Sequence, residues 1–146
     1  KMGKIYYTKE VYMATLFSDT WINELKDAWN QDPEVSAKLA EIGFNSVITC
    51  GYKDDEKPTC VFTVTNGQAV SAGLYNGETP DWDMRASEKD WMKWVEKPLG
   101  MTGMGMAFTT GKLKFVKGDF KQMIKTPSMA VPFVKSFSLM NQIGAE

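Results

Sequence analysis

The sequence predicts an α+β domain in which helices cover a five-stranded, mostly antiparallel sheet. Apolar residues recur with the 3.6-residue period of a helix before residue 43 and after residue 87. Between these parts β-branched and aromatic residues dominate, and two turn signals join three strand-like segments into hairpins. A chain of 146 residues is long enough for one domain with its own core and too short for two.

Three helices are expected in the first part of the chain. A short one covers residues 9–16, and the next begins after Ser18, a residue type that favours the N-cap position. Asp32 and Pro33 are typical of the start of a third helix, and Gly43 is typical of its end. The apolar residues that recur on one face of the middle helix are Trp21, Leu25, Ala28 and Trp29.

Three antiparallel strands are expected in the middle of the chain. Residues 44–52 and 59–65 are rich in β-branched and aromatic side chains, and the charged segment between them is typical of a turn. The Asn66-Gly67 pair favours a two-residue type I′ turn and leads into a strand over residues 68–75. These segments predict two hairpins that share their central strand.

The turn positions also predict which residues face each other across the strands. Cys50 is expected opposite Cys60. Ile48 is expected opposite Phe62, which in turn faces Ser71 in the third strand. On this face the third strand offers only small side chains, so another part of the structure must fill the space. A helix is the usual solution, and a ligand cavity is the alternative.

Strands and helices alternate in the second half of the chain. Ser87, with Asp90 three residues later, resembles a capping box at the start of a tryptophan-bearing helix, which Pro98 ends. Alternating lysines and apolar residues after Gly111 are typical of a half-buried edge strand. The expected elements are a strand over residues 81–87, helices over 88–97 and 101–109, a strand over 112–118, a short helix over 119–125 and a last helix over 128–143.

Composition and charge exclude several classes of protein. Hydrophobic residues make up 43% and charged residues 24% of the chain, as in ordinary soluble domains. A formal net charge of −1 argues against nucleic acid as a partner, because phosphate binding requires a basic excess. No apolar run approaches the roughly 18 residues of a membrane-spanning helix, and the first residues lack the apolar block of a signal peptide. We therefore expect a cytoplasmic protein whose Cys50 and Cys60 are reduced.

Histidine is absent from the sequence, which removes the most common tools of catalysis. Serine–histidine and cysteine–histidine nucleophile pairs cannot form, and two cysteines alone cannot complete a tetrahedral zinc site. Asp81 and Asp83 on one face of the fourth strand leave open a pair of carboxylates for acid–base chemistry, although solvated strand-edge residues are the simpler interpretation. We therefore expect no enzyme activity, no metal and no cofactor.

The glycine- and methionine-rich run from Leu99 to Gly111 does not match a phosphate-binding loop. Five residues rather than four separate Gly105 from Gly111, and Lys112 is followed by leucine instead of serine or threonine. The dinucleotide fingerprint fails as well, because Phe108 occupies the place of its third glycine. Two interpretations stay open: close contacts in an ordinary core, or a compliant wall of an apolar pocket, for which flexible methionines are suited.

The last part of the chain is basic, since residues 110–146 contain six lysines and only two acidic residues. Beside an apolar final helix, such lysines suit either a solvated face or transient contact with an anionic membrane. The lysines concerned are Lys112, Lys114, Lys117, Lys121, Lys125 and Lys135.

Three stretches of the sequence resemble the SCP-2 sterol-carrier family. They are FSDTWINELKDAWNQDPEVSAKL, WDMRASEKDWMKWVEK and MAFTTGKLKFVKGDFKQMIK, the last of which holds the glycine-lysine-leucine and glycine-aspartate motifs of the family. The resemblance covers residues 17–142. It implies an N-terminal extension at residues 1–16 and an SCP-2-like lipid-binding domain at residues 17–146.

The resemblance also implies an apolar tunnel that accepts a fatty acyl chain, an acyl-CoA or a sterol-like molecule. In this chain the tunnel is expected between the sheet face with Ile48 and Phe62 and the helices at residues 91–108 and 129–142. The residues expected to line it are Ile48, Phe62, Trp91, Trp94, Met101, Met104, Phe108, Phe115, Phe133, Phe137 and Met140.

Three functions follow as hypotheses from the residues and the resemblance together. The first is non-catalytic binding and transfer of a hydrophobic small molecule. The second is an accessory interaction module for a CoA-thioester or lipid-metabolising enzyme, as a homodimer or a hetero-complex. The third is an enzyme with a carboxylate or lysine base in its cavity.

Overall fold

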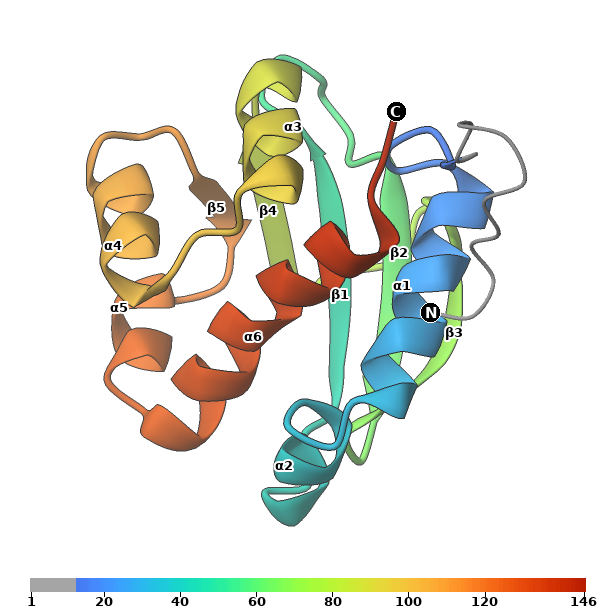
Figure 1. Cartoon of the computed structure of the whole chain (residues 1–146), viewed down its shortest axis with the longest axis vertical. Coiled ribbons are helices and arrows are strands. Elements are labelled where there is room, and N and C mark those ends of the chain that lie inside the picture. The colour runs from blue at the N-terminus through green and yellow to red at the C-terminus, as the bar shows by residue number, and fades with distance from the viewer. Residues whose placement is uncertain (1–12) are drawn as a thin grey trace.

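The computed structural model describes residues 13–146, which form a five-stranded mixed sheet with helices packed against it (Figure 1). The strands lie in the order β3-β2-β1-β4-β5, and all neighbouring pairs are antiparallel except β1 and β4, which are parallel. The predicted α+β class with a five-stranded, mostly antiparallel sheet is confirmed. The strands are β1 Ser46–Tyr52, β2 Cys60–Thr65, β3 Gln68–Leu74, β4 Trp82–Ala86 and β5 Lys114–Lys117. The helices are α1 Asp19–Gln31, α2 Ser36–Glu41, α3 Glu88–Glu96, α4 Met101–Thr109, α5 Phe120–Ile124 and α6 Pro127–Ile143.

The turn between β2 and β3 forms where local chemistry predicts it. Asn66 and Gly67 have positive φ angles of 49° and 84°, as a type I′ turn requires. A Cβ atom at position 67 would also overlap the backbone of Ala40 in α2. Glycine therefore serves both the turn and the close approach of a helix.

The register of β1 against β2 agrees with the prediction, whereas that of β3 departs from it. Ile48 faces Phe62 as expected, but Phe62 faces Ala72 rather than Ser71. A β-bulge leaves Val70 without a partner and shifts the rest of β3 by one residue. The side chain of Val70 is consequently 56% exposed at the edge of the sheet.

A side chain from α1 holds this bulge in place. The carboxamide oxygen of Asn30 accepts a hydrogen bond from the Ala69 N–H at 2.7 Å, and its NH₂ group donates to the Ala69 carbonyl at 2.8 Å. Turn residues determine the register only next to the turn, and a contact with a distant helix cannot be read from them. This is the physical reason why the predicted Phe62–Ser71 pair is wrong.

The helix α1 lies over β2 and β3 and connects three distant parts of the chain (Figure 1). The Ser18 hydroxyl caps it by accepting from the Trp21 N–H at 3.2 Å. The Trp21 indole donates to the Gly144 carbonyl at 2.8 Å, and the Trp29 indole donates to the Gly67 carbonyl at 3.0 Å. The apolar face predicted for this helix is confirmed, because all four of its residues are buried.

The longest helix, α6, crosses the sheet on the same side as α1 (Figure 1). Pro127 stands at its first position, where the missing N–H costs no hydrogen bond. It ends at Gly144, whose φ of 69° is easy for glycine and strained for other residues. Within the part of the chain that the structure describes, no helix is long and apolar enough to cross a membrane.

The two ends of the described chain lie beside each other. The Leu16 N–H donates to the Glu146 carbonyl at 3.1 Å, and the Glu146 N–H donates to the Ala14 carbonyl at 3.0 Å. The first half of the predicted helix over residues 9–16 lies outside the described residues, and its second half, residues 13–16, is not helical. The boundary expected at residue 17 stays a prediction.

Candidate functional site

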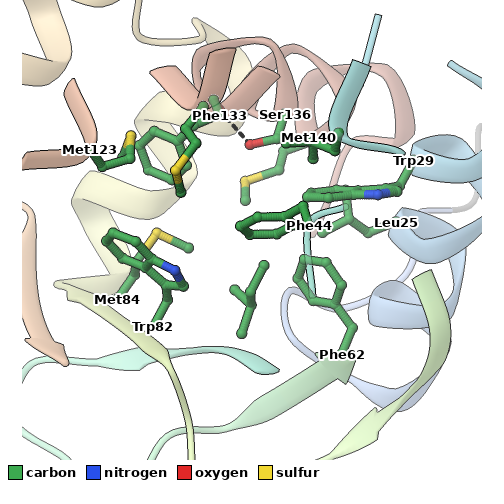
Figure 2. Close-up of a pocket in the computed structure, with 13 residues that line it drawn as sticks. Leu25, Trp29, Phe44, Phe62, Trp82, Met84, Met123, Phe133, Ser136 and Met140 are labelled. Atoms are coloured by element: carbon green, nitrogen blue, oxygen red, sulfur yellow. Dashed lines mark hydrogen bonds between the residues drawn. The ribbon is translucent and has the colours of Figure 1, made fainter. Parts of the chain in front are cut away.

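An apolar pocket of ≈ 50 Å³ lies between the sheet and α6 (Figure 2). All of its lining residues have aliphatic, aromatic or methionine side chains except Ser136, and none of them is ionisable. Such a surface offers burial of apolar area and very few polar contacts. The lining residues are Leu25, Trp29, Leu39, Phe44, Ile48, Phe62, Trp82, Met84, Met123, Met129, Phe133, Ser136 and Met140.

The sheet provides one wall of the pocket through three neighbouring strands. Ile48 pairs with Phe62 on β2 and with Trp82 on β4, so these three residues form a row across the sheet. Met84 lies two residues beyond Trp82 and therefore points to the same face. The Trp29 ring from α1 meets the Phe62 ring edge-on, with centroids 5.1 Å apart.

The helix α6 provides the opposite wall with a single stripe of side chains. Met129, Phe133, Ser136 and Met140 follow one another at intervals of four, three and four residues, which places them on one helix face. Met123 from α5 adds to this wall next to Phe133 (Figure 2). Four of the pocket residues are therefore methionines, and their unbranched side chains adapt easily to different shapes.

Four of the eleven residues expected to line a tunnel lie at this pocket: Ile48, Phe62, Phe133 and Met140. The tunnel was expected between the sheet, α6 and the helices α3 and α4. The pocket lies against α6, but α3 and α4 contribute none of its lining residues. Whether any of the eleven residues contacts a ligand stays a prediction.

Trp91, Trp94 and Phe137 lie instead in a solid aromatic cluster with Phe17. The Trp91 ring centroid is 5.2 Å from that of Phe17, 5.5 Å from that of Trp94 and 6.2 Å from that of Phe137. The Trp91 indole also donates to the Gly51 carbonyl at 2.9 Å. The structure places these three residues in the core, outside the pocket, and their contact with a ligand stays a prediction.

The remaining four predicted residues belong to the part of the molecule around α4. Phe108 and Phe115 stack around Phe120, with ring centroids 4.5 and 5.1 Å from it. Met104 is fully buried, whereas Met101 is 43% exposed. The sequence left two interpretations of the glycine- and methionine-rich run open, an ordinary core contact and a pocket wall. Met104 fits the core contact, whereas the exposed Met101 fits neither.

Sequence reasoning missed the other nine lining residues. In α6 the helical period was a signal, because Met129, Phe133 and Met140 recur on one face, but a second apolar stripe competes with it. The competing stripe recurs at helical spacing as well, and the sequence favours it as the buried one. It consists of Val131, Val134, Phe137 and Met140. Val131 is 58% exposed, so the stripe that faces the pocket is rotated from the expected one. The residues missed are Leu25, Trp29, Leu39, Phe44, Trp82, Met84, Met123, Met129 and Ser136.

The two aspartates considered for acid–base chemistry bind other groups, away from the pocket. Asp83 is buried and accepts from the Arg85 guanidinium, with Oδ1 2.7 Å from Nε and Oδ2 3.1 Å from an NH₂ nitrogen. Trp82 and Met84 face the pocket. Asp83 and Arg85 alternate with them along β4, so they face the opposite side of the sheet. The Asp81 carboxylate accepts from the Val47 N–H at 2.8 Å.

The cysteine pair lies between β1 and β2 as predicted, and both thiols are free and buried. Burial raises the pKa of the Cys60 thiol well above its ordinary value of 9.0, and its side-chain hydrogen bond with Cys50 acts in the same direction. A thiol held protonated is a poor nucleophile, so this environment favours an inert pair over a redox pair.

The raised pKa of Cys60 predicts that the protein loses stability in alkaline solution. The unfolded chain releases this proton above pH 9.0, whereas the folded chain keeps it, so the free energy of unfolding falls as pH rises through that value. One such group gives a slope of up to about 1.4 kcal/mol per pH unit. Burial also raises the pKa of Tyr52, which adds to the effect at higher pH.

Urea unfolding at pH 8 and pH 10 measures this slope. We expect the Cys60→Ala variant to show a smaller difference between the two pH values than the original protein does, after its general loss of stability is subtracted. The same pH difference in both proteins would contradict the assignment to Cys60.

The sheet order and the pocket together define a class of protein: a small α+β domain that encloses apolar space between its sheet and its last helix. The model of the SCP-2 sterol transfer family matches residues 22–128. The chain therefore belongs to the SCP-2 sterol transfer family, whose domains bind and transfer lipids. No curated protein sequence matches the chain.

Solved structures show the same fold at low sequence identity. A crystal structure of sterol carrier protein 2 superposes with a TM-score of 0.71 at 16% identity, over 88% of this chain and 99% of that one. The solution structure of a conserved hypothetical protein from Thermus thermophilus, described as possibly a sterol carrier protein, gives 0.63 at 17% identity, over 92% and 97% of the chains. The ubiquinone synthesis protein UbiJ-SCP2 gives 0.54 at 12% identity, over 82% and 87%.

Proposed function

We propose that this protein binds one hydrophobic small molecule in the pocket beneath α6 and carries it without changing it chemically. The observation that supports this most is the lining, which is apolar in every residue but Ser136 and includes no ionisable group. Burying apolar ligand surface there contributes roughly 25 cal/mol per Å², from which the cost of ordering the ligand is subtracted. A fatty acyl chain, the acyl part of an acyl-CoA and a sterol-like molecule all fit this chemistry.

The pocket must widen to accept such a ligand. A cavity of about 150 Å³ holds only a molecule of the size of benzene, and the present space is ≈ 50 Å³. Met123 and Met129 stand on either side of the junction between α5 and α6. Movement of these side chains, together with Met84 and Met140, provides the additional volume without breaking the sheet.

Native mass spectrometry of gently purified protein, followed by extraction with organic solvent, tests this function. We expect a bound lipid at one molecule per chain and saturable displacement of a fluorescent fatty-acid probe by the extracted lipid. Protein that carries no lipid and binds no probe would overturn the proposal. The compartment in which this takes place, expected to be the cytoplasm, stays a prediction.

Contact with an anionic membrane during transfer is a further part of the proposal. Five exposed lysines, near β5 and α5, make no ion pair with any residue from 13 to 146. Lys135, by contrast, lies 3.7 Å from the Glu34 carboxylate and 4.0 Å from that of Asp32. The five exposed lysines are Lys112, Lys114, Lys117, Lys121 and Lys125.

Sedimentation with lipid vesicles tests this contact. We expect binding to phosphatidylserine-containing vesicles, loss of binding in a Lys114→Glu, Lys117→Glu, Lys121→Glu variant, and no binding to neutral vesicles. Lys38→Glu, which changes an exposed lysine on α2, is the control and should leave binding unchanged. Equal sedimentation with both vesicle types would contradict the proposal.

An accessory role is the second candidate, favoured by one exposed apolar pair. Val70 and Leu74 on the edge strand β3 are 56% and 55% exposed, a surface that a second copy or an enzyme would cover. Analytical ultracentrifugation of the original protein and of a Val70→Ser, Leu74→Ser variant tests it. A dimer or hetero-complex that the variant loses supports the role, and a monomer at high concentration with no partner opposes it.

A further inference from the structure

The indole N–H of Trp82 stands out among the tryptophans of this protein. The indoles of Trp21, Trp29 and Trp91 donate to backbone carbonyl groups at 2.8, 3.0 and 2.9 Å. Trp82 and Trp94 have no such acceptor among residues 13–146, and of these two only Trp82 lines the pocket. Figure 2 shows its nitrogen edge directed toward the interior of the pocket.

The surroundings of Trp82 hold its ring in this orientation. Gly118, with a φ of 105°, lies so close that a Cβ atom there would overlap the six-membered ring of the indole. The Phe115 ring meets the Trp82 ring edge-on, with centroids 5.9 Å apart and an angle of 81°. The backbone of Trp82 is fixed by its pairing with Ile48. The N–H group therefore cannot turn toward a carbonyl without losing these contacts.

Trp82 is only partly buried, so water can reach its indole N–H. A ligand that displaces this water leaves the N–H without an acceptor, which is unfavourable unless the ligand brings one. The other polar group of the pocket, the Ser136 hydroxyl, donates to the Phe133 carbonyl at 2.5 Å (Figure 2). Its proton is thus engaged, and its oxygen retains the ability to accept. The pocket consequently offers one free donor, at Trp82, and one acceptor, at Ser136.

The absence of charge in the lining restricts the kind of acceptor that a ligand can bring. No ionisable side chain is among the residues that line the pocket. A carboxylate buried there would lose its water without gaining a counter-charge, which is costly. A hydroxyl, ketone or ester oxygen loses much less on burial and gains a hydrogen bond from the indole.

We propose that the Trp82 Nε1–H donates a hydrogen bond to the ligand and selects uncharged lipids that carry a hydroxyl or carbonyl oxygen over plain hydrocarbons. This inference rests on the proposed function and adds to it the polar group by which the ligand is recognised. Trp82 is accordingly a specificity-determining residue in a pocket whose other lining residues, apart from Ser136, are apolar.

Competition binding separates this role from a purely apolar one. The uncharged fluorescent probe diphenylhexatriene is displaced by 1-hexadecanol and by n-hexadecane. The experiment compares the original protein with the Trp82→Phe variant, which keeps an aromatic ring but lacks the N–H. We expect Trp82→Phe to weaken hexadecanol binding about three- to tenfold, the effect of one hydrogen bond, and to change hexadecane binding less than about twofold. Met84→Leu, on the same face of β4, is the control and should change both ligands in parallel.

Nuclear magnetic resonance gives a readout that a change of shape alone would not produce. The indole ¹⁵N–¹H signal of Trp82, assigned by its absence in Trp82→Phe, should move downfield with hexadecanol and much less with hexadecane. Equal weakening of both ligands in Trp82→Phe, or an indole signal that does not respond to the alcohol, would overturn the role of Trp82 while leaving lipid binding intact. Failure of the original protein to bind either ligand or the probe would overturn the proposed function and this inference with it.

Discussion

Replacing Trp91 by alanine is expected to lower the free energy of unfolding by about 3–5 kcal/mol, the range for removing a large aromatic side chain from a core. Trp91 is fully buried between Phe17, Trp94 and Phe137. The substitution leaves a cavity among these rings and removes the hydrogen bond to the Gly51 carbonyl. Urea unfolding followed by circular dichroism measures the loss.

The Trp91→Phe variant separates the ring from its hydrogen bond. It keeps most of the apolar contact and leaves the Gly51 carbonyl without its donor, so we expect a smaller loss of about 1–3 kcal/mol. The sequence favours Trp91 as part of a ligand wall. That interpretation predicts that Trp91→Ala loses lipid binding and keeps most of its stability. A Trp91→Ala protein with nearly unchanged stability but no lipid binding would show that the ligand reaches this cluster.

Replacing Ser136 by leucine is expected to reduce lipid affinity at least about tenfold, equivalent to 1.4 kcal/mol, with little loss of stability. Ser136 is 5% exposed and points into the pocket from the middle of α6 (Figure 2). The larger side chain occupies space that is empty in the present structure, so it competes with the ligand and not with a core residue. Probe displacement and thermal unfolding measure the two effects.

Ser138→Leu is the matched control, because Ser138 is exposed on the same helix. It makes the same chemical change outside the pocket and should leave affinity unchanged. If Ser136→Leu binds lipid as well as Ser138→Leu does, the ligand site lies elsewhere in the molecule. If Ser136→Leu unfolds instead, the pocket is less able to accept added volume than its shape indicates.

Much of the fold could be predicted because its determinants are local. Ser18 and Ser87 cap their helices by accepting from a backbone N–H three residues later, as expected from their positions. The Asn66-Gly67 turn sets the first pairs of the second hairpin, down to Val64 opposite Ala69. Periodicity and turn chemistry act within a few residues, so they are visible in the order of the amino acids alone. The family resemblance rests on the same local patterns and is confirmed over residues 22–128.

The candidate site could be predicted only in part because its residues meet through packing. Ile48 and Phe62 were found because a hairpin register brings them together. Trp82 was not found, because it pairs with Ile48 across two parallel strands that no turn connects. For α6, two stripes of comparable hydrophobicity were available, and the one with Ser136 faces the pocket.

By itself, then, the sequence determined the fold class, the Ser18 and Ser87 caps, the Asn66-Gly67 turn and the family, whereas the helix expected to start at Asp32 and Pro33 begins at Ser36. Only the tertiary structure decided which face of α6 meets the sheet, where the bulge shifts β3, and that Gly118 and Phe115 orient the Trp82 indole toward the pocket. The reason is physical: helix period and turn type depend on adjacent residues, whereas the rotation of a helix and the direction of a ring depend on the sum of contacts between segments far apart in the chain.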